Sequence, residues 1–489
     1  MVFTRRALLL GSGAAVGVFA TRHTASQLPI LDGVAVIAPE DLKTTLNDAS
    51  RLSQTPIHKH IVVRDDPGEA LLSTLRSELK DAAAGGRPVN IGAARHSMGG
   101  QSIPRDGHAI TFDTTWVEPR DGIYKAHAGA RWRDVIAALD PVGLSPKVMQ
   151  TNSDFGVAAT FSVNAHGWAT AFGPMGSTVR AIKIMLADGS HVTASSTENT
   201  PIFAAAMGGY GLIGLITELE VEAVPAALIE PNFEEMSAED FSAAFESTVG
   251  QVPMAYGRLN IDRAGFFKDA LLISYHPVEG ELPPASVSGF RAALTRNIFR
   301  SQVGNEWIKR RRWGLETQLG PLVAGPVSRS GIMNESVVTL LGQSGRERTD
   351  IIHEYFVTPD KFNDFLTACR AIIPNSYQEL LNITMRWVEQ DTTSMLSYAP
   401  LGSRIASVMS FSQEMTARGD ADMALMTRKL IKAVHELGGS YYLPYRPHAT
   451  VAQFSEGYER SAEFAALKRE LDPGLVLRNA LWDRYLADL

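Results

Sequence analysis

Apolar and polar residues follow two different spacings in the N-terminal half of the chain, and they predict short strands mixed with helices. Leu71, Leu75 and Leu79 repeat at helical spacing, which predicts a helix over 68–84 that ends at Gly85. Shorter helices are expected at 131–139 and 202–207. β-rich runs predict strands at 58–64, 88–91, 109–112, 123–128, 179–186, 190–194 and 212–224. Asp188–Gly189 predicts a hairpin turn between the strands at 179–186 and 190–194. Because strands and helices alternate irregularly, we predict an α+β domain and not a doubly wound sheet.

The second half has a different pattern. Longer helical stretches at 360–371 and 420–437 stand between β-rich runs such as 406–411. We therefore predict one domain over 40–225 and a second over 226–450. A C-terminal segment, 451–489, follows, and we expect it to close with an aromatic helix or coil after 472–474.

Composition narrows the function classes. The 489 residues are 45% hydrophobic and 20% charged, which argues against a disordered or multi-span membrane protein. The net charge is −7, so no basic excess supports a nucleic-acid partner. Cys369 is the only cysteine, which excludes internal disulfides, cysteine-ligated metal clusters and a CxxC redox pair. No metal site is predicted, and any redox chemistry must come from a bound cofactor.

The N-terminus resembles an export signal. Arg5 and Arg6 precede a small, apolar stretch over 7–20. This stretch is shorter than the ~20 residues of a membrane span. We predict a twin-arginine signal over 1–25 and a periplasmic or other extracytoplasmic location. The alternative is a chance arginine pair before a buried helix.

The first chemical motif is a loop of small residues over 92–102, which follows the strand at 88–91. Such a loop presents backbone N–H groups to a pyrophosphate. It matches neither a Walker sequence nor a GxGxxG dinucleotide fingerprint. His96 lies within it, and a neutral imidazole is a nucleophile that would tether a flavin covalently. The alternative is that His96 hydrogen-bonds within a turn.

Two further stretches of small residues follow, over 154–167 and 208–217. The third has Gly208, Gly209, Gly211 and Gly214 between a helix and a β run, a spacing that allows close approach of a ligand. Each stretch alone is explained by a tight turn. Together, three such loops favour a large dinucleotide site.

In combination these motifs resemble the FAD-binding domain of the vanillyl-alcohol oxidase/PCMH flavoprotein family. The resemblance covers about 55–225 and 450–489, and is nearest to sugar-alcohol and aldonolactone oxidases, cytokinin dehydrogenases and decaprenylphosphoryl-ribose oxidases. It implies two α+β subdomains that hold FAD, and a cap domain with an antiparallel sheet. One departure is Ala158–Ala159, where relatives commonly carry two glycines. The cofactor-binding residues that it implies are Gly92, Ala93, Ala94, Arg95, His96, Ser97, Gln101, Ser102, Val157, Ala158, Ala159, Ser162, Asn164, His166, Gly167, Gly211, Gly214 and Ile216.

The resemblance also implies the chemistry: oxidation at a C–H that carries oxygen or nitrogen, with hydride passing to flavin N5. Several members attach FAD through a histidine placed like His96. We expect an alcohol substrate such as a sugar, polyol or lactone, and oxygen or another electron acceptor. Arg386 resembles an arginine that faces the flavin in sugar-alcohol oxidases, and Glu354 is a second candidate there; the alternative for either is a structural ion pair. His448 or Tyr445 is the expected base, although two nearby prolines also fit a rigid crossover.

Two other functions stay open. A C=C reductase of the sterol-reductase type would use NAD(P)H, and a flavin-free scaffold would bind a sugar or lipid. The segment Lys309–Trp313 is basic and aromatic, which predicts either a solvated charged surface or a weak contact with a membrane or a phosphate-bearing substrate.

Overall fold

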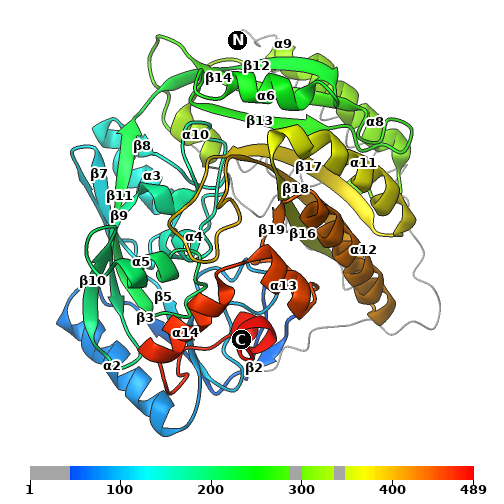
Figure 1. Cartoon of the computed structure of the whole chain (residues 1–489). Coiled ribbons are helices and arrows are strands. Elements are labelled where there is room, and N and C mark those ends of the chain that lie inside the picture. Colours follow the sequence, from blue (N-terminus) through cyan, green and yellow to red (C-terminus); the bar gives the residue numbers. More distant parts are fainter. Residues whose placement is uncertain (1–43, 286–299, 335–346) are drawn as a thin grey trace.

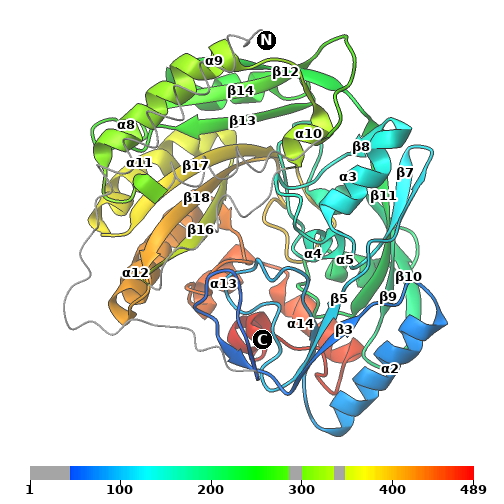
Figure 2. The same cartoon turned by 180° about the vertical axis from the view of Figure 1, so that it is seen from behind.

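The computed structural model describes residues 44–285, 300–334 and 347–489. The predicted signal segment, 1–25, lies outside them. The described residues form an N-terminal domain with two separate main sheets and a cap domain with one large sheet (Figures 1 and 2). These layers of helices and sheets confirm the predicted α+β class.

The first sheet of the N-terminal domain is parallel, in the order β3 (Lys59–Val63), β5 (His108–Phe112), β4 (Val89–Ile91). Helix α2 (Glu69–Ala84) buries Leu71, Leu75, Leu79 and Ala82 on one face, as the leucine spacing predicted. The chain then turns at Gly85–Gly86, where Gly86 has a φ of +62°. A short antiparallel pair, β1 (Thr45–Leu46) and β2 (Thr55–Pro56), precedes this unit.

The second sheet is antiparallel. Its order is β10 (His191–Ser195), β9 (Val179–Met185), β11 (Leu215–Pro225), β7 (Ile123–His127), β6 (Val117–Arg120), and β8 (Leu144–Pro146) pairs with the end of β11. The predicted hairpin between β9 and β10 is present, with Gly189 at a φ of +83°. Three helices accompany this sheet: α3 (Trp132–Leu139), α4 (Val157–Ser162) and α5 (Thr200–Ala206). Helix α4 forms where the sequence analysis placed a loop.

The cap sheet has eight strands, in the order β15 (Val327–Ser328), β12 (Leu228–Ser237), β14 (Asp269–Pro277), β13 (Met254–Leu259), β17 (Glu379–Val388), β18 (Arg404–Glu414), β16 (Arg348–Val357), β19 (Ser440–Tyr441). Helices α11 (Phe362–Ile372) and α12 (Ala417–Glu436) confirm the two predicted long helices. They cover the outer face together with α6 (Phe241–Thr248), and leave the other face toward the N-terminal domain (Figures 1 and 2). Shorter helices are α8 (Glu306–Gly314), α9 (Gly320–Val323) and α10 (Arg329–Met333).

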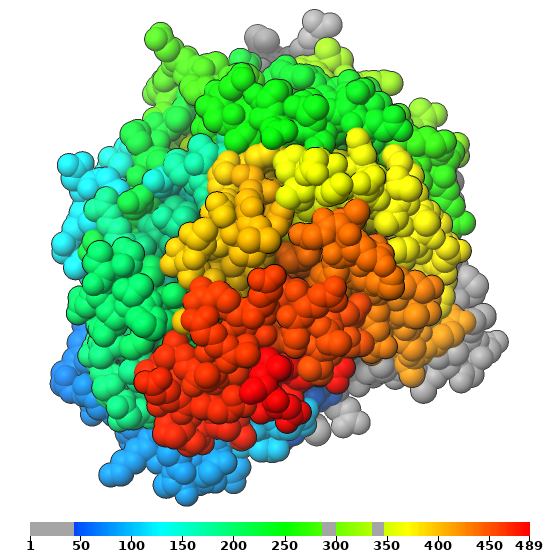
Figure 3. Space-filling view, viewed as in Figure 1, coloured from blue at the N-terminus to red at the C-terminus, as the bar shows by residue number. Residues whose placement is uncertain are grey.

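The C-terminal segment lies against the N-terminal domain. It contains α13 (Val451–Gly457), α14 (Ser461–Leu471) and a closing turn, Trp482–Leu486. Leu477 forms a parallel bridge with Val89 beside β4, and the Asn479 amide donates to the Tyr210 carbonyl at 2.9 Å. Figure 3 shows this red segment between the blue-green N-terminal domain and the orange cap helices. Across the ranges described, no helix is both long and apolar enough to span a bilayer.

Candidate functional site

A large cavity lies between the N-terminal domain and the inner face of the cap sheet. It contains about 2150 Å³ of space free of protein atoms, part of which opens to solvent. All three predicted small-residue segments line it. The predicted cofactor-binding residues on its wall are Ala93, Ala94, Arg95, His96, Ser97, Gln101, Ser102, Ala158, Ala159, Ser162, His166, Gly211, Gly214 and Ile216.

The first segment leaves β4 and is held at both ends. The Gly92 N–H donates to the Ile110 carbonyl at 2.9 Å, which continues the parallel sheet for one residue. The Gln101 amide donates to the carbonyls of Leu443 and Tyr445, at 2.7 and 2.8 Å. The loop therefore joins the N-terminal domain to the return crossover, residues 441–448, which leads back from the cap. These contacts fix the path of the loop along the cavity.

His96 lies on the cavity wall with its ring against Phe155, the centroids 4.4 Å apart. Burial lowers the pKa of His96 to about 4, so its imidazole is neutral at neutral pH. Its Nδ1 atom is buried without a protein hydrogen-bond partner.

The second segment places Ala158 and Ala159 in the cavity wall from helix α4. Gly156 comes just before α4, and a Cβ there would lie 3.0 Å from the Ala93 Cβ. Glycine thus allows the first two segments to pack in direct contact. Two alanine methyls, and not two glycines, thus form this part of the cavity wall.

The third segment follows α5 and leads into β11. Gly211 has a φ of +74°, which favours glycine. At Gly214 a Cβ would lie 2.5 Å from the Ile184 Cγ1, so only glycine lets the chain pass β9 at this point. Both residues line the cavity with Tyr210 and Ile216.

Several buried polar atoms on the cavity wall have no protein partner: His96 Nδ1, Ser102 Oγ, Gln150 Nε2 and Trp168 Nε1. Buried donors and acceptors are costly when unpaired, so such atoms indicate a polar ligand. A large cavity with small residues on three backbone segments and unpaired polar atoms on its wall fits a large dinucleotide such as FAD.

Four predicted cofactor-binding residues do not line the cavity: Gly92, Val157, Asn164 and Gly167. Asn164 instead joins the two domains, because its Nδ2 donates to the Asp391 carboxylate and its Oδ1 accepts from the Gly176 N–H, each at 2.9 Å. Gly167 provides close packing, since a Cβ there would lie 1.9 Å from the Met149 carbonyl oxygen. Asn164 and Gly167 therefore fix the backbone next to the cavity wall, although neither is part of the wall itself.

The cap sheet presents a row of side chains to the cavity. Across four neighbouring strands, Arg258 pairs with Thr384, Thr384 with Val408, and Val408 with Glu354. All four line the cavity. Side chains of a strand alternate between faces, so Asn382, Arg386, Ser410 and Ile352, two residues away on their strands, lie on the same face.

Three of the four predicted catalytic residues meet at one end of this row. The Tyr445 hydroxyl donates to Glu354 Oε2 at 2.9 Å, and the other oxygen of Glu354 contacts His166 Nε2. Arg386 Nη1 donates to the His166 carbonyl at 3.2 Å. His166 was predicted to bind the cofactor, and the structure also makes it the partner of Glu354.

Charge and hydrogen bonding set the ionisation of this group. Burial raises the pKa of Glu354. Contacts with His166, Arg386 and the Tyr445 hydroxyl lower this pKa by a larger amount, so the net shift is downward. Glu354 is therefore a carboxylate at neutral pH. Burial also raises the pKa of Tyr445 well above its usual value, so Tyr445 carries its proton.

His448, the fourth predicted catalytic residue, does not line the cavity. Its Nδ1 lies 3.2 Å from the Thr427 hydroxyl on α12, and its Nε2 lies 3.7 Å from Asp420. These contacts place His448 between the cap sheet and α12. Two residues of the return crossover were proposed as base, and only Tyr445 reaches the cavity.

Sequence reasoning missed several wall residues. Trp168, Arg258, Asn382, Ser410 and Tyr442 line the cavity and belong to none of the motifs. The alternation of polar residues at 382, 384 and 386 in β17 was an available signal, because polar residues on a buried strand face need partners or a ligand.

The basic segment Lys309–Trp313 is divided between two environments. Lys309 is buried and its Nζ lies 2.8 Å from Glu379; Arg312 is buried and its Nε donates to Glu316 at 2.7 Å. Only Arg310 and Arg311 face solvent among the four cations. Because helix α8 buries Lys309 and Arg312, two of the four cations, the segment is neither a fully solvated charged surface nor a continuous basic surface for lipid.

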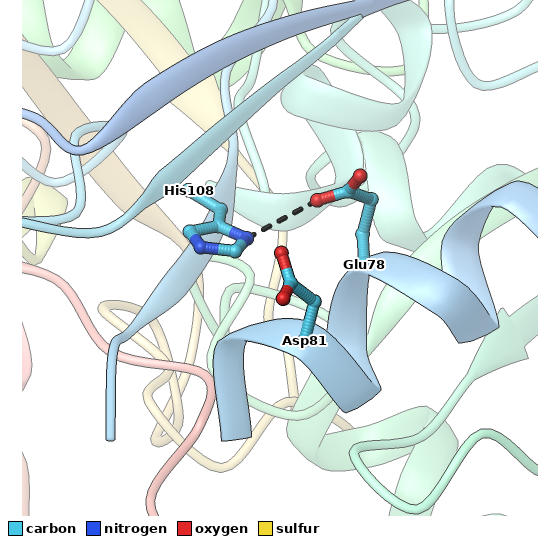
Figure 4. Close-up of side chains that lie close together, drawn as sticks. All are labelled: Glu78, Asp81 and His108. Carbon is cyan, nitrogen blue, oxygen red and sulfur yellow. Dashed lines mark hydrogen bonds and ion pairs between the residues drawn. The ribbon is translucent and has the colours of Figure 1, made fainter. Parts of the chain in front are cut away.

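Glu78, Asp81 and His108 are the one group of three close potential metal ligands in the described part of the chain (Figure 4). The Lys59 ammonium lies 2.8 Å from both carboxylates, so it already supplies the balancing positive charge. None of the three lines the cavity.

Comparison with known proteins bears on this cavity. Residues 72–195 match the family model described as "FAD binding domain". Cytokinin dehydrogenase 5 of Arabidopsis thaliana is 27% identical over 205 residues, which cover 40% of this chain and 37% of that protein. A putative D-arabinono-1,4-lactone oxidase of Neurospora crassa is 28% identical over 148 residues, 27% of either chain. Cytokinin dehydrogenase 7 of rice is 30% identical over 150 residues, 28% of either chain.

These matches span about a quarter to two-fifths of the length of the curated relatives. They confirm the predicted FAD-binding domain of the vanillyl-alcohol oxidase/PCMH type, with FAD as its cofactor. The flavin-free scaffold is thereby unsupported. The family model ends at residue 195 and so does not cover the cap.

Proposed function

We propose that this protein is an FAD-dependent oxidoreductase that oxidises a hydroxyl-bearing carbon of a sugar, polyol, lactone or related compound. The observation that carries the proposal is the cluster of Glu354, Tyr445, Arg386 and His166 on the wall of the cavity that the three small-residue segments also line. The relatives named as lactone oxidases support the same class of substrate.

FAD, when bound, supplies the two-electron acceptor for a hydride from the substrate carbon. Ala93–Ser102, Ala158–Ser162 and Gly211–Ile216 would hold it, since these segments line the cavity. Glu354 accepts the proton of the substrate hydroxyl, either directly or through the Tyr445 hydroxyl that is bonded to it. His166 holds the carboxylate in place, and the Arg386 guanidinium stabilises negative charge that develops beside the cluster.

The decisive test is anaerobic reduction of the purified yellow protein. Bleaching of the flavin band by hydroxyl compounds, and not by NADPH, supports the proposal. Bleaching by NADPH alone would favour the C=C reductase. Glu354→Gln should keep the flavin and slow its reduction by the substrate.

We also propose that FAD is attached covalently through His96. Its place on the cavity wall, its neutral imidazole and its unpartnered Nδ1 support this assignment. Precipitation of the protein with acid separates the two forms of binding, because a tethered flavin stays in the pellet.

We infer from residues 1–25 that the protein is exported through the twin-arginine pathway. The paired arginines Arg5 and Arg6 ahead of a short apolar stretch support this inference. The double substitution of Arg5→Lys and Arg6→Lys should leave the full-length protein in the cytoplasmic fraction. Equal export of the variant and the natural chain would contradict the inference.

A further inference from the structure

The end of the cavity away from Glu354 is built around a second cationic group. Arg258 lies on β13, at the far end of the row that runs through Thr384 and Val408 to Glu354. Neighbouring strands are ~4.8 Å apart, so three strand steps separate the two backbones by roughly 14 Å. A ligand that lies along this row has its reacting carbon at the Glu354 end and another of its groups at Arg258.

Two guanidinium groups share one acceptor at this end. Arg258 Nη1 and Arg312 Nη2 both donate to the same neutral atom, Asn382 Oδ1, the latter at 2.8 Å. Glu316 contributes the carboxylate of the cluster and accepts from Arg312. Among the described residues no carboxylate forms an ion pair with Arg258, and Arg258 is the guanidinium of this cluster that lines the cavity.

One of the unpaired donors of the cavity wall belongs to a ring that lies near Arg258. The indole Nε1 of Trp168 is buried without a hydrogen-bond partner, and Trp168 lines the cavity. Its ring is stacked on Tyr256 at 4.3 Å, and the Arg258 guanidinium lies 5.6 Å from the centroid of that same tyrosine ring. An unpaired N–H donor and a guanidinium that contact the same tyrosine ring favour an acceptor with negative charge.

We propose that the substrate carries an anionic group, a carboxylate or a phosphate, which Arg258 binds at the end of the cavity opposite to the oxidised carbon. This inference rests on the proposed function, since it names the substrate class of the same site. Thr384 and Ser410, between the two ends, provide hydroxyls for the sugar-like middle of the ligand. A neutral polyol would leave Arg258 without an anionic partner in the cavity.

Three probes with related carbon chains test this assignment: D-glucitol, D-gluconate and D-glucitol 6-phosphate. Their binding to the holoprotein is measured by calorimetry under nitrogen. One of the two anions should bind at least tenfold more tightly than D-glucitol, and the better one identifies the anionic group. Arg258→Gln should weaken that anion by about ten- to one-hundredfold and D-glucitol by less than threefold. Arg258→Lys, which keeps the charge, should restore part of the loss.

Arg263→Gln is the matched control, because Arg263 follows the same strand but is exposed and does not line the cavity. Equal binding of all three probes, binding of none, or equal losses in the Arg258→Gln and Arg263→Gln variants would overturn the proposal. Flavin bleaching by the same probes is recorded separately. If an anion binds through Arg258 and no hydroxyl compound bleaches the flavin, the proposed oxidation fails while the anion site stands.

Discussion

At the scale of single residues, His96 is the side chain whose chemistry is most directly testable. A neutral imidazole with an unpartnered nitrogen on the cavity wall is available for a covalent bond. His96→Ala should therefore release all yellow colour into the supernatant on acid precipitation, while the natural protein keeps it in the pellet. His58→Ala, at an exposed histidine outside the cavity, should behave like the natural protein. Colour in the supernatant of the natural protein would contradict the tether.

Glu354 determines the expected pH dependence. Its pKa lies below the ordinary 4.5, so the proton-accepting carboxylate is present at all higher pH values. The rate of anaerobic flavin reduction should be insensitive to this group from neutral to mildly acidic pH, and should fall only as the pH drops below about 4.5. An acidic limb centred between pH 6 and 7 would identify a different group as the base.

The same residue gives a substitution test. Glu354→Gln removes the proton acceptor but keeps a partner for Tyr445, so the rate of flavin reduction should fall by about 10²- to 10⁴-fold with the visible spectrum preserved. Glu414→Gln is the control, because Glu414 is also buried in the cap sheet but does not line the cavity. A rate lowered equally in both variants would mean that stability, and not proton transfer, explains the loss.

At the scale of elements, the sequence predicted those helices and turns that are determined by the spacing of neighbouring residues along the chain. The leucine repeat of α2 and the Asp188–Gly189 turn each have a local physical cause, and both are present. Helix α4 was not predicted, because six residues are too few to show a helical repeat of apolar positions. A helix this short depends on tertiary contacts for its stability. The sequence did not predict Arg258 in the cavity, and it suggested a catalytic role for His448, which lies outside the cavity. Whether a polar side chain reaches the cavity depends on strand register and on packing between distant segments, which local spacing does not determine.

Backbone packing at the second segment gives an element-scale prediction. A Cβ at Gly167 would lie 1.9 Å from the Met149 carbonyl, and backbone cannot move aside as a flexible side chain does. Gly167→Ala should therefore destabilise the protein by about 2 kcal/mol or more and lower its flavin content, because His166 and Trp168 on either side line the cavity. Thermal unfolding and the ratio of flavin to protein absorbance measure both effects.

Gly314 provides the contrast within the same chain. It lies in α8 with a φ of −60°, and a Cβ there would meet no atom within 4 Å. Gly314→Ala should leave the flavin content unchanged and stabilise the protein by up to about 1 kcal/mol, since alanine favours helix. Similar losses at both positions would show that the close contact at Gly167 is not the cause.

At the scale of the whole molecule, the cavity is shared by two domains, so FAD should stabilise both at once. A ligand that binds only the folded state adds about 2.7 kcal/mol at one hundred times its dissociation constant. In the His96→Ala protein, stripped of FAD and then reconstituted, hydrogen exchange should slow together in the 93–102 loop and in the cap strands around Glu354 and Ser410. Protection confined to the loop would mean that the cap does not close on the cofactor, and Arg386 and Glu354 would then not share a site with the three small-residue segments.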